Sequence, residues 1–143
     1  MTDQNARENA REELCSGHET LTEARVLCDN RLYNGAVARA YYAAFHCARA
    51  VLFLRGLETR THRGVIQMLT LHLVRAGDLP KEAAALLAQL ATNRELADYR
   101  SPASFVEDDA RQAVADAEAF IAACRPLLRG LGVDADQGRG RRT

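Results

Sequence analysis

Four polar side chains recur along one alanine-rich segment, residues 38–56, at intervals of three, four and three. They are Arg39, Tyr42, His46 and Arg49. Because a helical turn takes about 3.6 residues, this spacing places them on one stripe, opposite the alanines that would pack against neighbours. Arginine pairs with phosphate oxygens, histidine exchanges protons near neutral pH, and aromatic rings are enriched at interfaces. The stripe therefore predicts the polar wall of a cleft or a subunit interface, with a solvent-exposed face as the alternative.

A second group of charged residues lies where the segment 81–99 should be apolar. The helical stripe of this segment consists of Ala83, Leu86, Leu87, Leu90 and Ala91. Continued by one turn, the stripe reaches Arg94, and Asp98 follows four residues later. A buried guanidinium without a partner is costly, so we expect an ion pair between these two side chains. The pair would either fix the register of the helix or line a cleft in which Arg94 faces a ligand phosphate.

A third candidate, His62, stands between Arg60 and Arg63 in the stretch ETRTHRGV, where a new helix is predicted to begin. Backbone N–H groups at the start of a helix attract anions, and neighbouring arginines strengthen this effect. The pattern indicates an anion site, and a capped, solvent-facing loop is the alternative.

The elements that must position these residues are helices, because patterns with a period of about 3.6 residues run nearly end to end. No stretch alternates apolar and polar residues for long enough to predict a strand. We predict helices over residues 4–29, 34–56, 61–77, 81–99 and 104–128. Their short connections predict an all-α antiparallel bundle of about five helices. The second helix is expected at its centre, since its many alanines permit close packing.

Capping residues set the expected ends of these helices. Asn34 should cap the N-terminus of the second helix, and Gly56 should follow its last turn. The sequence SFVE, from Ser104 to Glu107, has the spacing of a capping box for the fifth helix.

Composition limits the classes of function. The 143 residues are 48% hydrophobic and 27% charged, with a formal net charge of +0, as in an ordinary globular protein. No overall field would attract nucleic acid or a membrane, and the longest apolar run, residues 50–54, is too short to span a bilayer. The polar N-terminus lacks the pattern of a signal peptide, so we expect a cytoplasmic protein. We expect one domain over residues 1–129 and a flexible tail over 130–143.

Cysteines and histidines do not have the spacing of metal ligands. The four cysteines form no Cys-x-x-Cys pair, and the four histidines form no His-x-x-x-His pair. We therefore expect no metal and no cofactor, and thiols that serve as small core residues in a reducing compartment.

Three segments, in this order along the chain, carry a resemblance to a known family. They are AVARAYYAAFHCARAVLFLRG, THRGV and NRELADYR. The first contains the pattern Arg-x-Tyr-Tyr-x-x-Phe-His, and the third contains Arg-x-x-x-Asp-Tyr. Between residues 21 and 128 the chain resembles small prokaryotic proteins of the HEPN family (higher eukaryotes and prokaryotes nucleotide-binding).

The resemblance implies a helical bundle that often dimerises and is commonly encoded beside a minimal nucleotidyltransferase, as a toxin and antitoxin pair. Many HEPN proteins are metal-independent RNases with an arginine that is followed four to six residues later by a histidine. Two copies of this motif meet at a dimer interface. The histidine acts on the ribose 2′-hydroxyl, and the arginine stabilises charge on the phosphate.

The RNase motif matches this chain only in part. Arg94 corresponds to the arginine of the motif, but Tyr99 stands where the histidine is expected. Tyrosine, with a pKa near 10, is a poor base at neutral pH. In related HEPN toxins a nearby tyrosine receives AMP from the partner, which makes Tyr99 a candidate for the same modification.

We therefore predict a homodimeric HEPN bundle that acts as the nucleotide- or protein-binding component beside a nucleotidyltransferase. The predicted binding residues are Arg39, Tyr42, His46, Arg49, His62, Arg94, Asp98 and Tyr99. One alternative is a metal-independent endoribonuclease toxin, in which Arg94 works with His46 as the histidine able to approach it. The other is a non-catalytic dimeric scaffold whose polar stripe is a dimer seam. The residues leave open whether the protein is an enzyme, and which RNA or nucleotide it would take.

Overall fold

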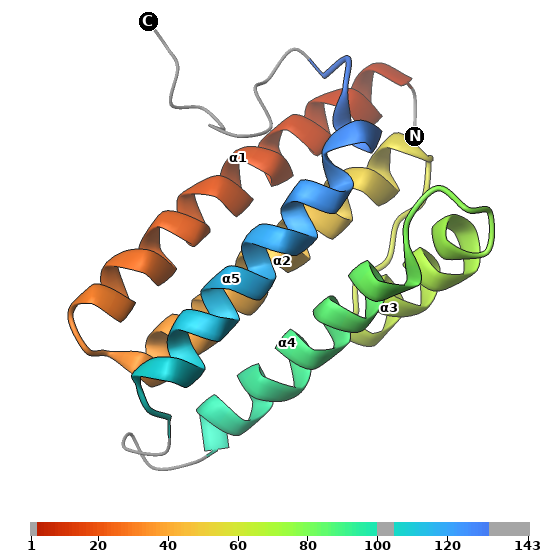
Figure 1. The fold of residues 1–143 in the computed structure, drawn as a ribbon. Helices are drawn as coiled ribbons and strands as arrows, with labels where there is room; N and C mark the ends of the chain where they lie inside the picture. Colours follow the sequence, from red (N-terminus) through yellow and green to blue (C-terminus); the bar gives the residue numbers. More distant parts are fainter. Residues whose placement is uncertain (1–2, 100–104, 132–143) are drawn as a thin grey trace, which may run out of the picture.

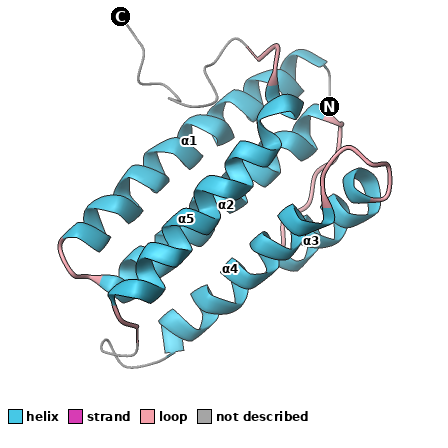
Figure 2. Cartoon of the chain, in the orientation of Figure 1, coloured by secondary structure: helices cyan, strands magenta, loops and turns pink. Residues whose placement is uncertain are grey.

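The computed structural model describes residues 3–99 and 105–131, and in this part of the chain it contains helices and no strands. The elements are α1 (Asp3–Asp29), α2 (Tyr33–Leu54), α3 (His62–Leu69), the π-helical turn η1 (Thr70–Val74), α4 (Lys81–Tyr99), α5 (Glu107–Cys124) and the 3₁₀ turn η2 (Arg125–Leu128). Short loops join the helices (Figure 2). The predicted all-α bundle of five helices is confirmed.

Helix α2 lies at the centre of this bundle. It contacts α1, α3, α4 and α5, and its contact with α1 is the most extensive. Helices α1 and α4 run in the direction opposite to α2 and α5, and α3 lies beside α4 (Figure 1). The prediction that the alanine-rich helix is central is therefore confirmed.

Small side chains explain how α2 accommodates so many neighbours. Its fully buried alanines are Ala36, Ala40, Ala43, Ala44, Ala48 and Ala50. Alanine adds little bulk between two helices, so their axes can approach closely. At Gly17 of α1 even a methyl group would be tight, because a Cβ there would lie 3.1 Å from the carbonyl oxygen of Ala43.

Two predicted helix ends are confirmed by the local geometry. The Thr61 hydroxyl caps α3 by accepting a hydrogen bond from the N–H of Gly64 at 2.9 Å. Gly56 follows the last turn of α2 with a φ of +73°, a conformation that costs glycine little. The cap at Thr61 fixes where the next residue, His62, enters α3.

The predicted cap at Asn34 is wrong. Helix α2 begins at Tyr33, one residue earlier. The Asn34 side chain instead donates to the carbonyl oxygen of Ala97 at 3.4 Å and accepts from the N–H of Phe105 at 3.3 Å. Asn34 thereby ties the end of α4 and the start of α5 to the central helix.

The predicted capping box of α5 is also wrong. Helix α5 begins at Glu107, so Glu107 is its first residue and not its third. The N–H of Val106 is satisfied by the carboxylate of Asp109 at 3.0 Å. The expected cap itself, Ser104, lies outside the described residues.

The folded region extends past the domain end expected at residue 129. Leu131 is fully buried, and the carbonyl oxygens of Gly130 and Leu131 accept hydrogen bonds from Arg7 and Arg11 of α1. The rest of the predicted tail, 132–143, lies outside the described residues.

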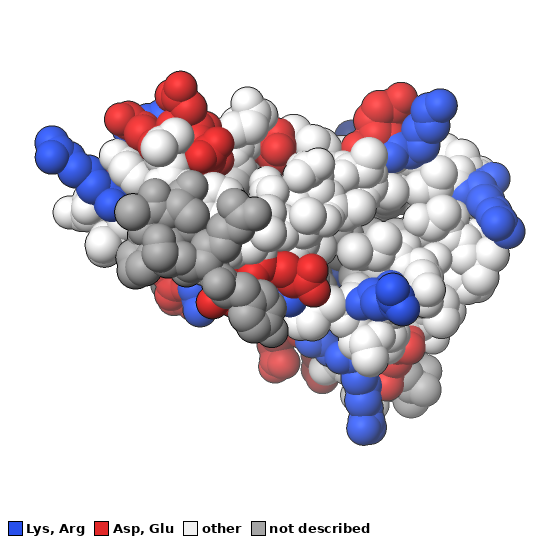
Figure 3. Space-filling model, turned by 90° about the horizontal axis from the view of Figure 1, so that it is seen from below, with Lys and Arg blue, Asp and Glu red and all other residues white. Residues whose placement is uncertain are grey.

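Charges of both signs are scattered over the surface. Figure 3 shows a face on which acidic and basic side chains are interspersed among uncharged atoms. No helix in the described ranges is long and apolar enough to cross a membrane. Any attraction of a charged ligand must therefore come from a local cluster of residues.

Candidate functional site

A cavity of about 460 Å³ opens between α2, α3 and α4. Its polar lining comes from Tyr41 of α2, from His62, Arg63 and Gln67 of α3, and from Arg94 and Glu95 of α4. Two candidates from distant parts of the sequence, His62 and Arg94, thus share one cavity. We call it the α2–α4 cavity.

Arg94 lies against aromatic rings at the wall of this cavity. Its guanidinium carbon is 5.6 Å from the ring centre of Tyr41 and 5.8 Å from that of Tyr42, within the range of cation–π attraction. Its Nη1 pairs with Asp98 Oδ2 at 2.8 Å, which is the ion pair predicted from the spacing. The buried Nε–H has no hydrogen-bond partner among the described residues. A buried donor without an acceptor is unusual in proteins, and it marks the side of the guanidinium at which an acceptor is missing.

His62 is held by aromatic rings of α2. Its ring centre lies 4.4 Å from that of Phe45 and 5.9 Å from that of Tyr42, and its Nδ1 is 2.6 Å from the hydroxyl of Tyr41. Burial, together with the charges of Arg94 and then Arg49, lowers the pKa of His62 below its ordinary value of 6.5. The imidazole is therefore neutral at neutral pH.

Tyr41 is the residue of this site that sequence reasoning missed. Its side chain is fully buried, and burial raises the pKa of its hydroxyl well above 10, against a smaller opposing effect of Arg94. The helical wheel assigned the polar stripe to the neighbouring Tyr42. The available signal was the position of Tyr41 four residues before Phe45, which puts both rings on one face of α2.

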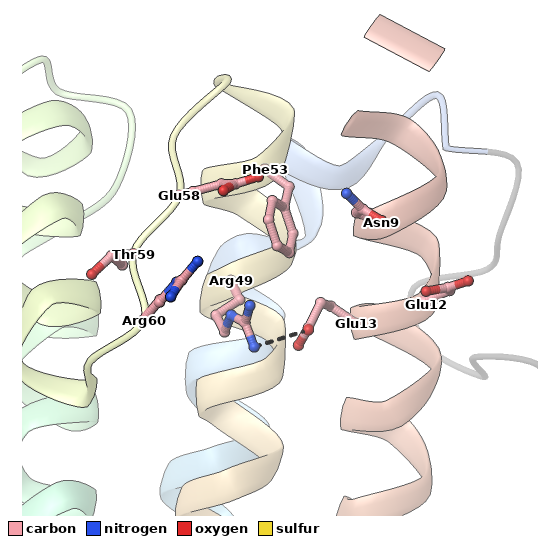
Figure 4. A pocket seen from close by; sticks show the side chains of 8 residues that line it. All are labelled: Asn9, Glu12, Glu13, Arg49, Phe53, Glu58, Thr59 and Arg60. Carbon is pink, nitrogen blue, oxygen red and sulfur yellow. Dashed lines mark ion pairs between the residues drawn. The ribbon is translucent and has the colours of Figure 1, made fainter. Parts of the chain in front are cut away.

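His46 lies in a different environment from the one expected. Its Nδ1 is 2.8 Å from Oε1 of Glu13, and the other carboxylate oxygen of Glu13 is 3.2 Å from Nη1 of Arg49. Figure 4 shows Glu13 of α1 reaching across to Arg49 of α2. His46 is not the only histidine able to approach Arg94, because His62 shares the cavity with Arg94.

The predicted polar stripe is therefore divided between two neighbours of α2. Arg39 pairs with Glu23 of α1 at 3.6 Å, so it joins His46 and Arg49 in facing acids of α1. Tyr42 instead lies against Arg94 and His62. Most of the stripe is thus a helix–helix contact within the chain, and Tyr42 packs behind two residues of the cavity wall, Arg94 and His62.

Replacing Glu13 by glutamine is expected to lower the free energy of unfolding by about 1–3 kcal/mol. A carboxylate accepts hydrogen bonds from both His46 and Arg49, whereas an amide keeps one acceptor and turns its NH₂ group toward the other donor. Urea denaturation measures the change. The control is Glu12→Gln at the exposed neighbouring position, which should stay within about 0.5 kcal/mol of the wild type. Equal effects of the two substitutions would mean that the Glu13 contacts contribute nothing specific.

The last predicted binding residues lie at the end of α4. Asp98 is partly exposed and holds Arg94, while the side chain of Tyr99 lies outside the described part of the chain. Within the described ranges no three His, Cys, Asp or Glu residues are grouped as metal ligands.

Comparison with known proteins places this geometry in a family. The family model for the HEPN domain matches residues 10–127. A Methanocaldococcus jannaschii protein named "Putative toxin" is 34% identical over 113 residues, which cover 79% of this chain and 84% of that protein. UPF0332 proteins of Gloeobacter violaceus and Thermotoga maritima are 36% and 30% identical, and the matches cover 72% and 79% of this chain and 82% and 86% of those proteins. The chain belongs to the HEPN domain family.

Proposed function

We propose that the α2–α4 cavity binds the phosphate group of a nucleotide, in a toxin-type HEPN protein that works with a nucleotidyltransferase partner. The observation that carries the proposal is Arg94, a cation at the cavity wall that shares the cavity with Arg63 and His62. A phosphate oxygen is the acceptor that a guanidinium binds most strongly. The cavity volume of about 460 Å³ lies within the range of small-molecule sites.

The charges around the cavity favour an anion. Arg63 and Arg94 line it, whereas Arg49, whose charge also acts on His62, lies outside the lining and is paired with Glu13 of α1. The acids on this side are Glu95 and Asp98, and Asp98 is already bound to Arg94. Among the residues that line the cavity, two arginines therefore stand beside one carboxylate, that of Glu95, although the whole chain is neutral.

Thermal unfolding of the wild-type protein with AMP, ATP, inorganic phosphate or adenosine tests the proposal. A ligand that binds only the native state raises the midpoint, so the three phosphate-bearing compounds should raise it. Adenosine, which has the same base and sugar as AMP but no phosphate, should leave it unchanged. An equal response to AMP and adenosine, or no response to either, would contradict a phosphate site.

The partner and the homodimer are the parts of the proposal that rest on the resemblance and on the name of the relative. The relative from Methanocaldococcus jannaschii is named "Putative toxin". The resemblance to small prokaryotic HEPN proteins implies a nucleotidyltransferase partner and a homodimer. Mixing the chain with a minimal nucleotidyltransferase from the same organism should give a stable complex in size-exclusion chromatography with light scattering, and separate elution of the two proteins would contradict the pairing. The same experiment on the chain alone measures its own oligomeric state.

An endoribonuclease is the second candidate, and one observation favours it. His62 is neutral at neutral pH and shares the cavity with Arg94, so a histidine and an arginine of the required types are close together. Under this alternative, the wild type should cleave RNA in the presence of a chelator, and both His62→Ala and Arg94→Ala should abolish cleavage. Intact RNA after prolonged incubation with the wild type would exclude this alternative.

A further inference from the structure

We propose that Tyr41 is a positioning residue, which holds His62 in the tautomer with its proton on Nε2 and so makes the histidine a hydrogen-bond donor to the ligand. The inference rests on the proposed phosphate site, in which it makes the His62 imidazole a hydrogen-bond donor. It is carried by the hydrogen bond between Tyr41 and His62 and by the burial of the tyrosine.

The Tyr41 hydroxyl has one acceptor for its hydrogen. Although Tyr41 forms part of the cavity wall, its side chain has no solvent-exposed surface. Among the described residues, the partner of the hydroxyl is Nδ1 of His62, at 2.6 Å. Because a buried hydroxyl without an acceptor is costly, its hydrogen must point to Nδ1.

The opposite direction of the hydrogen bond would leave a buried group unsatisfied. If Nδ1 of His62 carried the proton and donated to the Tyr41 oxygen, the tyrosine hydrogen would have no acceptor in the described structure. Ionisation of the tyrosine does not remove this conflict, because burial raises the pKa of its hydroxyl. Tyr41 therefore donates, and the single proton of the neutral imidazole lies on Nε2.

The surroundings of His62 keep its ring in place for this bond. Phe45 stacks on the imidazole and Tyr42 meets it at an interplanar angle of 72°. The charged groups around it are Arg49 on α2 with its partner Glu13 on α1, Arg63 on α3, and Glu95 and Arg94 with its partner Asp98 on α4. Burial and then the charges of Arg94 and Arg49 lower the pKa of the ring and so disfavour a second proton on it.

The tautomer decides what the histidine can do in the cavity. With Nδ1 occupied by Tyr41, Nε2 is the ring nitrogen without a partner in the described residues, and it presents an N–H. Beside the guanidinium of Arg94, this gives two kinds of donor for the oxygens of one phosphate group. The same tautomer has no lone pair on Nε2, so His62 cannot take a proton from a ribose 2′-hydroxyl. The inference thus favours a binding site over an RNase that uses His62 as a base.

Nitrogen-15 NMR of the histidine rings in the ligand-free wild type tests the inference directly. The two-bond correlations of the His62 ring should show a protonated Nε2 and an unprotonated, hydrogen-bonded Nδ1 at neutral pH. The proposal is overturned if the wild type shows the proton on Nδ1. This measurement needs no variant, so it remains decisive if a substitution prevents folding.

Tyr41→Phe removes only the hydroxyl, so position 41 should no longer favour one tautomer of His62. The His62 signals should shift toward a mixture of both tautomers, and the titration midpoint should rise, because the lost bond favoured the neutral ring. AMP binding should weaken about 2- to 10-fold, the effect of one neutral hydrogen bond. The matched control, Tyr42→Phe, should leave the tautomer of His62 unchanged. Unchanged His62 signals in a folded Tyr41→Phe protein would contradict the role of Tyr41.

The two proposals fail in distinguishable ways. If the wild type shows the Nε2–H tautomer but no phosphate-bearing compound binds, the proposed function is wrong and the role of Tyr41 stands. If AMP binds through its phosphate while the proton lies on Nδ1, the function stands and the role of Tyr41 is wrong.

Discussion

Arg94→Ala is expected to weaken the binding of AMP by at least about 100-fold, because two hydrogen bonds from a charged group contribute about 3 kcal/mol or more. The guanidinium supplies the positive charge of α4 at the cavity wall, and its Nε–H has no other acceptor. Its loss leaves Asp98 without a partner, but Asp98 is partly exposed, so the protein should remain folded. Isothermal titration calorimetry measures the affinity, and circular dichroism confirms the fold.

The matched control is Arg55→Ala. Arg55 also forms an arginine–aspartate pair, with Asp78 at 3.1 Å, but it lies at the end of α2 outside the lining of the cavity. This variant should bind AMP as the wild type does. Arg94→Lys should show intermediate affinity, because lysine keeps the charge but lacks the planar fork of donors. Wild-type affinity in a folded Arg94→Ala protein would remove the main support for the phosphate site.

Phe120→Ala is expected to lower the free energy of unfolding by about 3–5 kcal/mol. Phe120 is fully buried in α5, which packs on the central helix α2. Removing the ring leaves a cavity in a fully buried part of the core, which closely packed neighbours fill only in part. Urea denaturation of both proteins gives the difference.

The control for this substitution is Val106→Ala just before α5. Val106 is 59% exposed, so its truncation should change the free energy of unfolding by less than about 0.5 kcal/mol. A loss of under about 1 kcal/mol for Phe120→Ala would mean that the contact between α5 and α2 is not part of the tightly packed core.

Local interactions were the part of the structure that the sequence predicted well. Helical periodicity predicts all five α-helices, and the spacing of Arg94 and Asp98 predicts their ion pair, because both depend on residues within one or two turns. The wrong cap at Asn34 has a long-range cause. Its side chain is bound by Ala97 and Phe105, which are distant in sequence and are brought to it by the packing of α4 and α5.

The assignment of the two histidines could not be predicted for the same reason. A helical wheel gives the face on which His46 lies, but not which neighbouring helix covers that face. Glu13 of α1 covers it, whereas α3 brings His62 to the cavity of Arg94. Tyr41 was missed because its role depends on a partner 21 residues further along the chain.

The pH dependence of stability follows from the same environment of His62. Its pKa is lowered in the folded state relative to the ordinary value of 6.5, so the unfolded chain binds the proton more readily. Above pH 6.5 the ring is neutral in both states, so His62 does not change the free energy of unfolding. As the pH falls below 6.5, the unfolded chain takes up the proton first, and the free energy of unfolding decreases.

The central claim is that a phosphate group binds beside His62 and Arg94, and titration of the His62 ring by NMR with and without AMP tests it most directly. In the free protein the titration midpoint should lie below 6.5. Saturating AMP should raise the midpoint, because the negative phosphate favours the protonated imidazole, and adenosine should not. An unchanged midpoint of His62 at saturating AMP would contradict the claim, since the phosphate would then lie elsewhere.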